Sequence, residues 1–270
     1  MSKGLKDKRL FLLDMDGTLY LGDKLFEGTA DFLEYIKNID GRYMFLTNNS
    51  SKSVDKYIEK LAWLGIESEA ADFFTSTEAT VKYLSGKNYK KIYAFGTASF
   101  RKELSANGLP VTDTLEYGID CLCMGFDTEL TFKKLEDACI LLGRGVDYIA
   151  TNPDWVCPTS YGYVPDCGSV SEMLARATGR TPYFIGKPRP DMVYYAMEKA
   201  GFSKDETIII GDRLYTDIAC GVNAGISTCF VLSGEGALED VEEGEIKPEF
   251  IFKNVKALCE ALKKLRESGE

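Results

Sequence analysis

The sequence predicts an α/β protein with a doubly wound parallel sheet as its core and a second α/β domain inserted into that core. Short apolar runs alternate with amphipathic segments at both ends of the chain, which is typical of a parallel sheet covered by helices on both faces. The run at 207–211, Thr-Ile-Ile-Ile-Gly, has the continuous β-branched character of a strand buried on both sides. The length of 270 residues allows one large domain or two smaller ones.

The N-terminal elements follow from apolar spacing and from turn signals. A strand is predicted over 10–13, because Leu-Phe-Leu-Leu is a short apolar run that the turn Asp16-Gly17 ends. Thr75 and Glu78 have the spacing of a capping box at the start of a helix. The same criteria predict a helix over 28–39, a strand over 43–47, a helix over 54–64, a strand over 73–75 and a helix over 79–84.

The strand–helix alternation resumes near the C-terminus. Pro190 stands at a first-turn position and Gly201 at a C-terminal position of the same predicted helix, as the preferences of these residues require. After the strand at 207–211 we predict a helix over 216–223, a strand over 227–231 and a helix over 255–265.

The middle segment, 82–180, has its own strand–helix rhythm. Strands are predicted over 91–95, 121–124 and 148–150, and helices over 100–107 and 131–142. We therefore assign 1–81 and 181–270 to the core and 82–180 to an inserted cap domain. The segment 151–168 is rich in Pro, Gly and Tyr and is predicted to be a long loop, a feature that is uncommon unless it serves as a lid or a binding loop.

Composition excludes several classes of function. The formal net charge is −10, and an acidic protein repels a phosphate backbone, so we expect no nucleic-acid partner. The chain has no histidine, which rules out a Ser-His-Asp triad and a His-ligated zinc site. Catalysis must then depend on carboxylates, other side chains, or a metal ion held by oxygen.

Cysteine usage and the N-terminus predict a reduced, cytoplasmic protein. Eight cysteines in 270 residues are too few for a disulfide framework in so long a chain, and most of them lie among apolar residues. The first apolar run, 10–13, is too short for a signal peptide or a membrane span. We therefore expect no membrane partner. Formation of a homo-oligomer is left open.

Polar residues follow three of the predicted strands. Asp14 and Asp16 follow the first strand, Thr47 and Asn48 end the second, and Asp212 follows the strand at 207–211. In an open α/β sheet, ligands bind at the edge formed by the carboxyl ends of the strands. An ordinary Asp-Gly turn is the alternative for Asp16-Gly17, but the repetition at three strand ends favours a site.

Asp14, Asp16 and Asp212 predict a magnesium site. Their carboxylates are hard oxygen ligands, and Mg²⁺ prefers a few of these together with water and a substrate phosphate. A cation would also offset the repulsion between the clustered carboxylates. Lys187 precedes a helix and can bring a positive charge to the same edge; a solvated loop lysine is the alternative. Gly186-Lys187-Pro188 is not a Walker loop, because no Ser or Thr follows the lysine.

Four motifs in order resemble those of the haloacid dehalogenase-like hydrolase superfamily, which has a Rossmann-like core. They are Asp14-Met-Asp-Gly-Thr18, Leu46-Thr-Asn-Asn-Ser50, Gly186-Lys-Pro188 and Gly211-Asp-Arg-Leu-Tyr-Thr-Asp217. The Thr-Asn-Asn-Ser form, the position of the insert and the stretch Ala150-Thr-Asn-Pro-Asp154 resemble its NagD-like and p-nitrophenyl phosphatase branch. The resemblance extends from Leu10 to about Val231.

The resemblance implies a role for each site residue. Asp14 would be the nucleophile that forms an aspartyl-phosphate, and Asp16 would act as general acid and then as general base. The phosphoryl oxygens would be held by Thr47, Asn48, Asn49 and Lys187. The Mg²⁺ site would be formed by Asp14, Asp16 (through its carbonyl), Asp212 and Asp217, the last of these acting through water or by orienting Lys187.

The function that this resemblance implies is Mg²⁺-dependent hydrolysis of small phosphate monoesters. Substrates of the nucleotide, sugar phosphate, phosphoglycolate or p-nitrophenyl phosphate type are expected, so the partner would be a small phosphorylated metabolite. A phosphomutase and a non-catalytic phospho-ligand sensor are the alternatives. The loop residues that would contact the leaving group, or instead fill the loop's own core, are Trp155, Cys157, Tyr161 and Tyr163.

Overall fold

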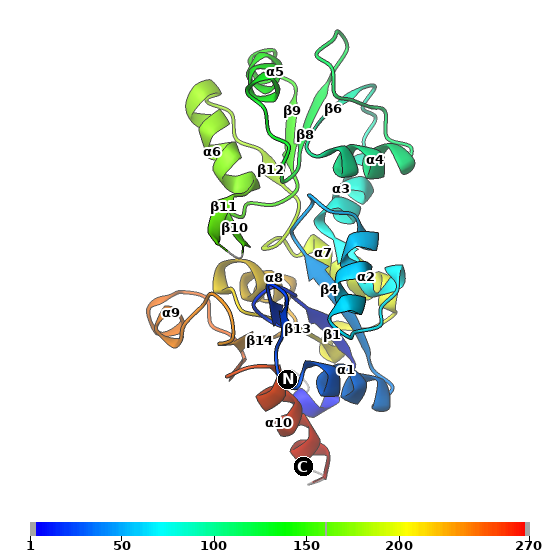
Figure 1. The fold of residues 1–270 in the computed structure, drawn as a ribbon, viewed down its shortest axis with the longest axis vertical. Helices are drawn as coiled ribbons and strands as arrows, with labels where there is room; N and C mark the ends of the chain where they lie inside the picture. The colour runs from blue at the N-terminus through cyan, green and yellow to red at the C-terminus, as the bar shows by residue number, and fades with distance from the viewer. Residues whose placement is uncertain (1–3, 160, 268–270) are drawn as a thin grey trace. The chain divides into compact units, whose positions relative to one another are not determined.

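The computed structural model describes residues 4–159 and 161–267 and divides the chain into two compact units (Figure 1). The first unit contains the N-terminal residues up to Thr47, the segment Ile58–Phe74 and everything from Lys187 onward. The second unit contains Asn48–Tyr57 and Thr75–Gly186. Each unit has its own parallel sheet.

In the described part of the first unit, six strands form the core sheet in the order β15-β14-β13-β1-β4-β5. The strands are β1 (Leu10–Leu13), β4 (Arg42–Thr47), β5 (Phe73–Thr75), β13 (Thr207–Gly211), β14 (Ser227–Val231) and β15 (Phe250–Phe252). The central strand β1 pairs in parallel with both β13 and β4, with Leu13 opposite Ile210 on one side and Phe45 on the other. The chain order reverses at β1, and a ligand site is expected at such a switch point.

Helices cover this sheet in the Rossmann-like manner predicted from the sequence. They are α1 (Thr29–Asn38), α2 (Val54–Trp63, which spans the unit boundary), α7 (Asp191–Ala200), α8 (Ala219–Ala224), α9 (Leu238–Glu243) and α10 (Val255–Glu267). Helix α1 packs against α10, and α7 packs against α8. Short 3-10 helices lie at Leu5–Asp7, Ala70–Asp72 and Lys204–Glu206, and β2 (Tyr20–Leu21) pairs antiparallel with β3 (Lys24–Leu25).

The second unit is a smaller α/β domain, with its described strands in the order β12-β9-β8-β6-β7. All four neighbouring pairs in this sheet are parallel. The strands are β6 (Ile92–Phe95), β7 (Val111–Thr112), β8 (Cys121–Met124), β9 (Asp147–Ala150) and β12 (Tyr183–Phe184), and the helices are α3 (Ser76–Ser85), α4 (Ala98–Ala106), α5 (Phe132–Gly143) and α6 (Cys167–Thr178). Figure 1 shows α5 and α6 together beside this sheet, where their apolar faces share one core with Phe95, Leu122 and Tyr148.

The second unit is larger than the predicted cap segment 82–180. It also includes all of α3 and the segment Asn48–Tyr57 that follows β4. The physical reason is side-chain and backbone contact: Ser76 Oγ donates to the carbonyl of Asn48 at 2.6 Å, and helix α3 packs against α4. The functional division into core and cap stays a prediction.

One local prediction was wrong, and one predicted helix differs in form. The segment 151–168 is not a continuous loop, because β10 (Val156–Thr159) and β11 (Gly162–Pro165) form an antiparallel hairpin within it. Pro158 and Pro165 obscure the strand pattern in the sequence, since proline is tolerated only in edge or isolated strands. The predicted helix 216–223 is a π-helical turn, Leu214–Ile218, followed by the short helix α8.

Two further findings concern the cysteines and the helices. All eight cysteines are free thiols. Within 4–159 and 161–267, none of the helices is both long and apolar enough to cross a membrane.

Candidate active site

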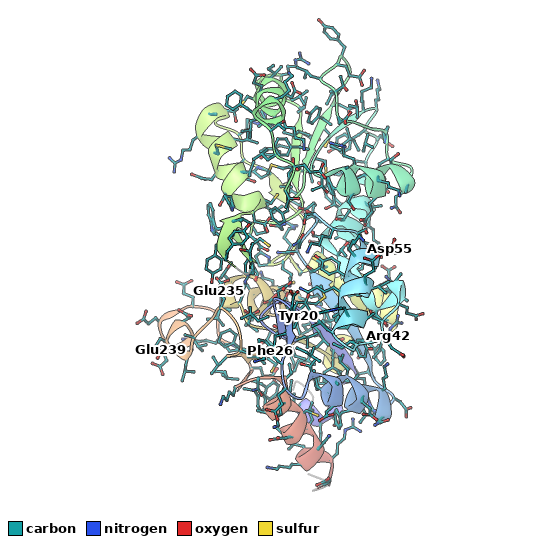
Figure 2. The ribbon with its side chains drawn as sticks, viewed as in Figure 1. Tyr20, Phe26, Arg42, Asp55, Glu235 and Glu239 are labelled. Carbon is teal, nitrogen blue, oxygen red and sulfur yellow. The ribbon has the colours of Figure 1, made fainter. Side chains whose placement is uncertain are left out.

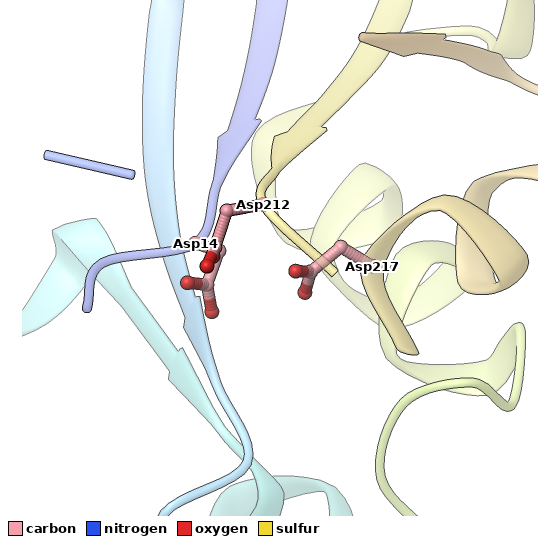
Figure 3. A group of neighbouring side chains, drawn as sticks. All are labelled: Asp14, Asp212 and Asp217. Atoms are coloured by element: carbon pink, nitrogen blue, oxygen red, sulfur yellow. The ribbon is translucent and has the colours of Figure 1, made fainter. Parts of the chain in front are cut away.

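Three aspartates meet at the carboxyl edge of the first unit's sheet. Asp14 follows β1, Asp212 follows β13, and Asp217 lies in the π-helical turn. Each contributes one carboxylate oxygen to a group whose atoms all lie within 4.8 Å of one another. Figure 3 shows the three carboxylates projecting into the same small space. The sheet register causes this convergence, because β1 and β13 are neighbours and end together.

Lys187 lies among these carboxylates. Its Nζ donates to Asp14 Oδ1 at 2.7 Å, to Asp217 Oδ1 at 2.6 Å and to the carbonyl of Leu46 at 3.1 Å. The residue is only 2% exposed, so it is not a solvated loop lysine. An ammonium group has three protons to donate, and these three acceptors hold it in a fixed position between β1, β4 and the π-helical turn.

The loop after β14 encloses Asp212. The amide of Glu235 donates to Asp212 Oδ2 at 2.7 Å, and Thr18 Oγ1 donates to Oδ1 at 3.3 Å. Gly17 has φ +90°, and a Cβ at Gly17 or at Gly234 would collide with the Asp212 carboxylate. Both positions therefore require glycine for close approach of the chain.

The π-helical turn places Asp217 beneath the end of β13. Its Oδ2 accepts a hydrogen bond from the amide of Arg213 at 3.2 Å, while Oδ1 binds Lys187. Such single π turns are frequent at functional sites because they change which side chain faces inward. The resemblance implied that Asp217 acts through water or by orienting Lys187. The contact with Lys187 is present, and the role of Asp217 stays a prediction.

The buried charges perturb one another strongly. Burial raises the pKa of Asp14 well above its ordinary value, and Asp217 and Asp212 add to the shift while Lys187 opposes it. Burial, followed by repulsion from Asp217, raises the pKa of Asp212 to about 6. Burial alone would lower the pKa of Lys187, but the carboxylates of Asp14 and Asp217 outweigh it and raise that pKa.

This donor set fits a divalent cation. Three carboxylates and one ammonium carry two negative charges in excess when all are ionised, and burial followed by mutual repulsion raises the pKa values of Asp14 and Asp212. All the donors in the group are oxygens, which suits hard cations. Gly17 and Gly234 let the chain approach the Asp212 carboxylate closely.

The raised pKa of Asp212 predicts how stability depends on pH. Between its ordinary pKa of 3.8 and the folded value of about 6, the folded state keeps a proton that the unfolded chain releases. Stability is therefore lost as pH rises through this window. Without metal, raising the pH from about 4 to about 7 should lower the unfolding free energy of the wild type by about 3 kcal/mol more than that of Asp212→Asn. Urea unfolding in the presence of a chelator measures the difference; two parallel stability–pH curves would contradict it.

Asp16 lies outside the three-carboxylate group. Its side chain is 41% exposed, and Lys60 Nζ lies 3.5 Å from its Oδ1. Tyr20, labelled in Figure 2, donates its hydroxyl to Asp16 Oδ2 at 3.3 Å. The sequence resemblance implied a metal contact only through the Asp16 backbone carbonyl, and this contact stays a prediction.

The residues predicted to hold the phosphoryl group divide between the two units. Thr47 ends β4 in the first unit and is buried. Asn48 and Asn49 begin the second unit, where Asn48 Nδ2 donates to Asp154 Oδ1 at 3.1 Å and Asn49 Oδ1 accepts from the amide of Ser51 at 2.9 Å. Contact of these three residues with a phosphoryl group stays a prediction.

Comparison with known proteins places this arrangement in a family. Residues 11–110 match the family described as haloacid dehalogenase-like hydrolase, and residues 184–258 match the HAD-hydrolase-like family. An acid sugar phosphatase of Staphylococcus haemolyticus is 32% identical, over 96% of this chain and 98% of the relative. The chain belongs to the haloacid dehalogenase-like hydrolases.

Solved structures narrow the assignment within the haloacid dehalogenase-like hydrolases. A 4-nitrophenylphosphatase from Thermotoga maritima is 41% identical, with a TM-score of 0.90 over 96% of this chain and 98% of that one. NagD from Escherichia coli K-12 is 30% identical, with a TM-score of 0.85 over 92% and 97% of the two chains. The chain is a member of the NagD and p-nitrophenyl phosphatase branch with a cap domain, and a phosphoric monoester hydrolase.

Sequence reasoning missed several residues around this hydrolase site. Glu235, labelled in Figure 2, holds Asp212 through its amide and pairs with Arg213 at 2.8 Å. Ser233 Oγ donates to the carbonyl of Gly17 at 2.8 Å. The available signal was Ser233-Gly-Glu-Gly236 directly after the strand at 227–231, a further polar segment at the same sheet edge. Tyr20 and Lys60 have no comparable signal, because their meeting depends on tertiary packing.

Proposed function

We propose that this phosphatase transfers the phosphoryl group of small monoesters to Asp14 and then to water, with Mg²⁺ held by Asp14, Asp212 and Asp217. The observation that carries the proposal is the contact of one buried lysine with two of three converging carboxylates. Sugar phosphates and p-nitrophenyl phosphate are the proposed substrate types, in line with the activities that name the relatives.

Exposure supports Asp14 as the nucleophile among the three aspartates. The Asp14 side chain is 17% exposed, whereas that of Asp217 is 1% exposed and the Asp212 residue is 1% exposed. A nucleophile must reach a phosphorus atom that enters from outside, so only Asp14 combines access with membership of the cluster. Lys187 offsets the charge of Asp14, which reduces its repulsion of an incoming phosphate dianion.

Two displacement steps complete the proposed reaction. In the first, an Asp14 oxygen forms a bond to phosphorus, the bond to the leaving oxygen breaks, and Asp16 gives its proton to that oxygen. In the second, water attacks phosphorus, Asp16 takes the proton back, and the bond between phosphorus and Asp14 breaks to release inorganic phosphate. Bound Mg²⁺ supplies charge stabilisation for the transferring phosphoryl group.

Metal dependence tests the proposal directly. Mg²⁺ should raise the melting temperature of the chelator-treated protein, since a ligand that binds only the folded state stabilises it. Asp212→Ala should lose both this shift and phosphate release from p-nitrophenyl phosphate. Glu239→Ala, an exposed acidic residue on α9 (Figure 2), is the matched control and should behave like the wild type. Full activity after exhaustive chelation would reject the metal site.

The β10–β11 hairpin is proposed to select the leaving group. A cavity of about 540 Å³ in the second unit is lined by hairpin residues, Cys157 and Tyr161 among them, together with Phe126 and Leu130. Trp155 lies beside the hairpin and Tyr163 lies in β11. They are 54% and 63% exposed, so they do not form a buried core within the loop.

Substitutions in this hairpin should change the order of substrates. We expect Trp155→Ala and Tyr161→Ala to change the ratio of kcat/KM between a sugar phosphate and p-nitrophenyl phosphate by roughly 10- to 200-fold, because one lost apolar contact is worth about 1–3 kcal/mol. Tyr117→Ala removes an aromatic residue of the same unit that is 93% exposed and should leave the ratio unchanged. Equal losses for all substrates would mean that the hairpin does not select them.

We propose that the protein acts on a small phosphorylated metabolite in the reducing environment of the cytoplasm. The eight free cysteines support this proposal, because disulfide-bonded cysteines would be expected in an oxidising compartment. Alkylation of the protein in cell extracts prepared with and without reductant would show whether these thiols are reduced in the cell.

A further inference from the structure

Each oxygen of the Asp16 carboxylate has its own partner in the first unit. Tyr20 Oη donates to Oδ2 at 3.3 Å, and Lys60 Nζ lies 3.5 Å from Oδ1. Lys60 comes from the C-terminal half of α2, whereas Asp16 lies in the turn after β1 and Tyr20 begins β2. Two elements far apart in sequence therefore hold one partly exposed carboxylate.

Tyr20 also fixes the position of Lys60. The Lys60 ammonium lies 3.9 Å from the centroid of the Tyr20 ring, a distance at which the ring face attracts a cation. Tyr20 itself is 0% exposed, its backbone forms a β-bridge with Asp16, and its carbonyl accepts a hydrogen bond from the amide of Gly17 at 2.8 Å. Asp16, Tyr20 and Lys60 thus form a closed set of three mutual contacts.

We propose that Tyr20 and Lys60 are positioning residues that hold the Asp16 carboxylate for proton transfer to the leaving group. This inference rests on the proposed role of Asp16 as general acid. Asp16 is not a member of the group formed by Asp14, Asp212 and Asp217. Each contact occupies one lone pair of an Asp16 oxygen, and the second lone pair of each oxygen can still hold a proton. Without these contacts, a half-exposed aspartate would sample several rotamers, and misplacement of a catalytic group by about 1 Å can cost about 10²-fold in rate.

Comparing substrates with different leaving groups distinguishes a positioning role from a merely structural one. Departure of p-nitrophenolate, a stable anion, needs little help from a general acid, whereas departure of an alkoxide from glycerol phosphate needs protonation. Because kcat/KM covers the steps up to departure of the leaving group, it is the parameter to compare. Tyr20→Phe and Lys60→Met should each lower kcat/KM for glycerol phosphate by about 10-fold or more, within the 10²- to 10⁴-fold worth of general acid catalysis. The loss with p-nitrophenyl phosphate should be less than about 2-fold.

A second lysine–tyrosine pair in the same unit supplies matched controls. Lys37 Nζ lies 5.6 Å from the centroid of the Tyr43 ring, and Tyr43 is near the start of β4, at the opposite end of that strand from Thr47. Lys37→Met and Tyr43→Phe should leave the ratio of the two substrates unchanged. Lys60→Arg keeps the positive charge and should restore part of the activity that Lys60→Met loses.

Asp16→Asn separates failure of this inference from failure of the proposed function. If Asp16 is the general acid, Asp16→Asn should itself lose far more activity with glycerol phosphate than with p-nitrophenyl phosphate, and adding Tyr20→Phe should cause little further loss. If Asp16→Asn discriminates but the Tyr20 and Lys60 variants do not, the positioning inference is wrong. Equal losses for both substrates in the Lys60 variant would also overturn it, because they would indicate that Lys60 contacts the phosphoryl group. If Asp16→Asn does not discriminate, the proposed role of Asp16 fails first.

Discussion

Asp14→Asn should abolish phosphate release, with a loss of about 10⁴- to 10⁶-fold in kcat, the range seen when a covalent nucleophile is removed. An amide has nearly the shape of the carboxylate but is a poor nucleophile, so the chemistry is lost while the fold is kept. Lys187 retains Asp217 and the carbonyl of Leu46 as acceptors, which should preserve the local structure.

Trapping of the intermediate makes this test specific to the covalent step. Acid quenching during turnover should leave protein-bound phosphate on the wild type and none on Asp14→Asn. Asp31→Asn, an exposed carboxylate on α1 of the same unit, is the matched control and should retain activity and labelling. Near-normal turnover by a folded Asp14→Asn protein would reject the aspartyl-phosphate route.

Lys187→Met is expected to have the second-largest effect, on both activity and stability. Removal of the ammonium leaves Asp14 and Asp217 buried without their shared counter-ion, and breaking a buried ion pair in this way costs about 3–5 kcal/mol of unfolding free energy. Activity should fall by about 10²- to 10³-fold, as when one preorganised electrostatic group is lost from an active site.

The pattern across substrates distinguishes Lys187 from the hairpin residues. The phosphoryl group is common to all monoesters, so Lys187→Met should reduce kcat/KM by a similar factor for p-nitrophenyl phosphate, a sugar phosphate and a nucleotide. Lys187→Arg tests geometry, because the planar guanidinium cannot reproduce three donor directions from one nitrogen; it should rescue stability more than rate. A loss confined to one substrate would mean that Lys187 recognises the leaving group.

Most of the sheet could be predicted from local sequence. The strands β1, β8, β13 and β14 have the predicted bounds, because strands buried on both faces are continuous apolar runs that short-range patterns reveal. Helix α3 begins at its predicted capping residue, with Thr75 Oγ1 accepting a hydrogen bond from the Glu78 amide at 3.0 Å. In these segments local propensity and burial agree.

Several of the segments that escaped prediction have weak local signals. The strands of the β10–β11 hairpin contain two prolines and one glycine, and β15 has only three residues. Helix α9 is short and strongly acidic, without an apolar stripe long enough to give a clear period. Their structure depends on the elements that they contact more than on their own residues.

The sequence by itself determined which chemistry this hydrolase can perform: aspartates at the ends of buried strands, a lysine before a helix, and no histidine. Those features are local, since each depends on one strand end or one residue count. Only the tertiary structure decided how the groups combine. It placed Lys187 between Asp14 and Asp217, the amide of Glu235 on Asp212, and Tyr20 and Lys60 on Asp16. The longest-range of these contacts, between Asp14 and Lys187, spans 173 positions of the chain. Distances and desolvation set these interactions, and neither quantity is encoded in any short segment of the chain.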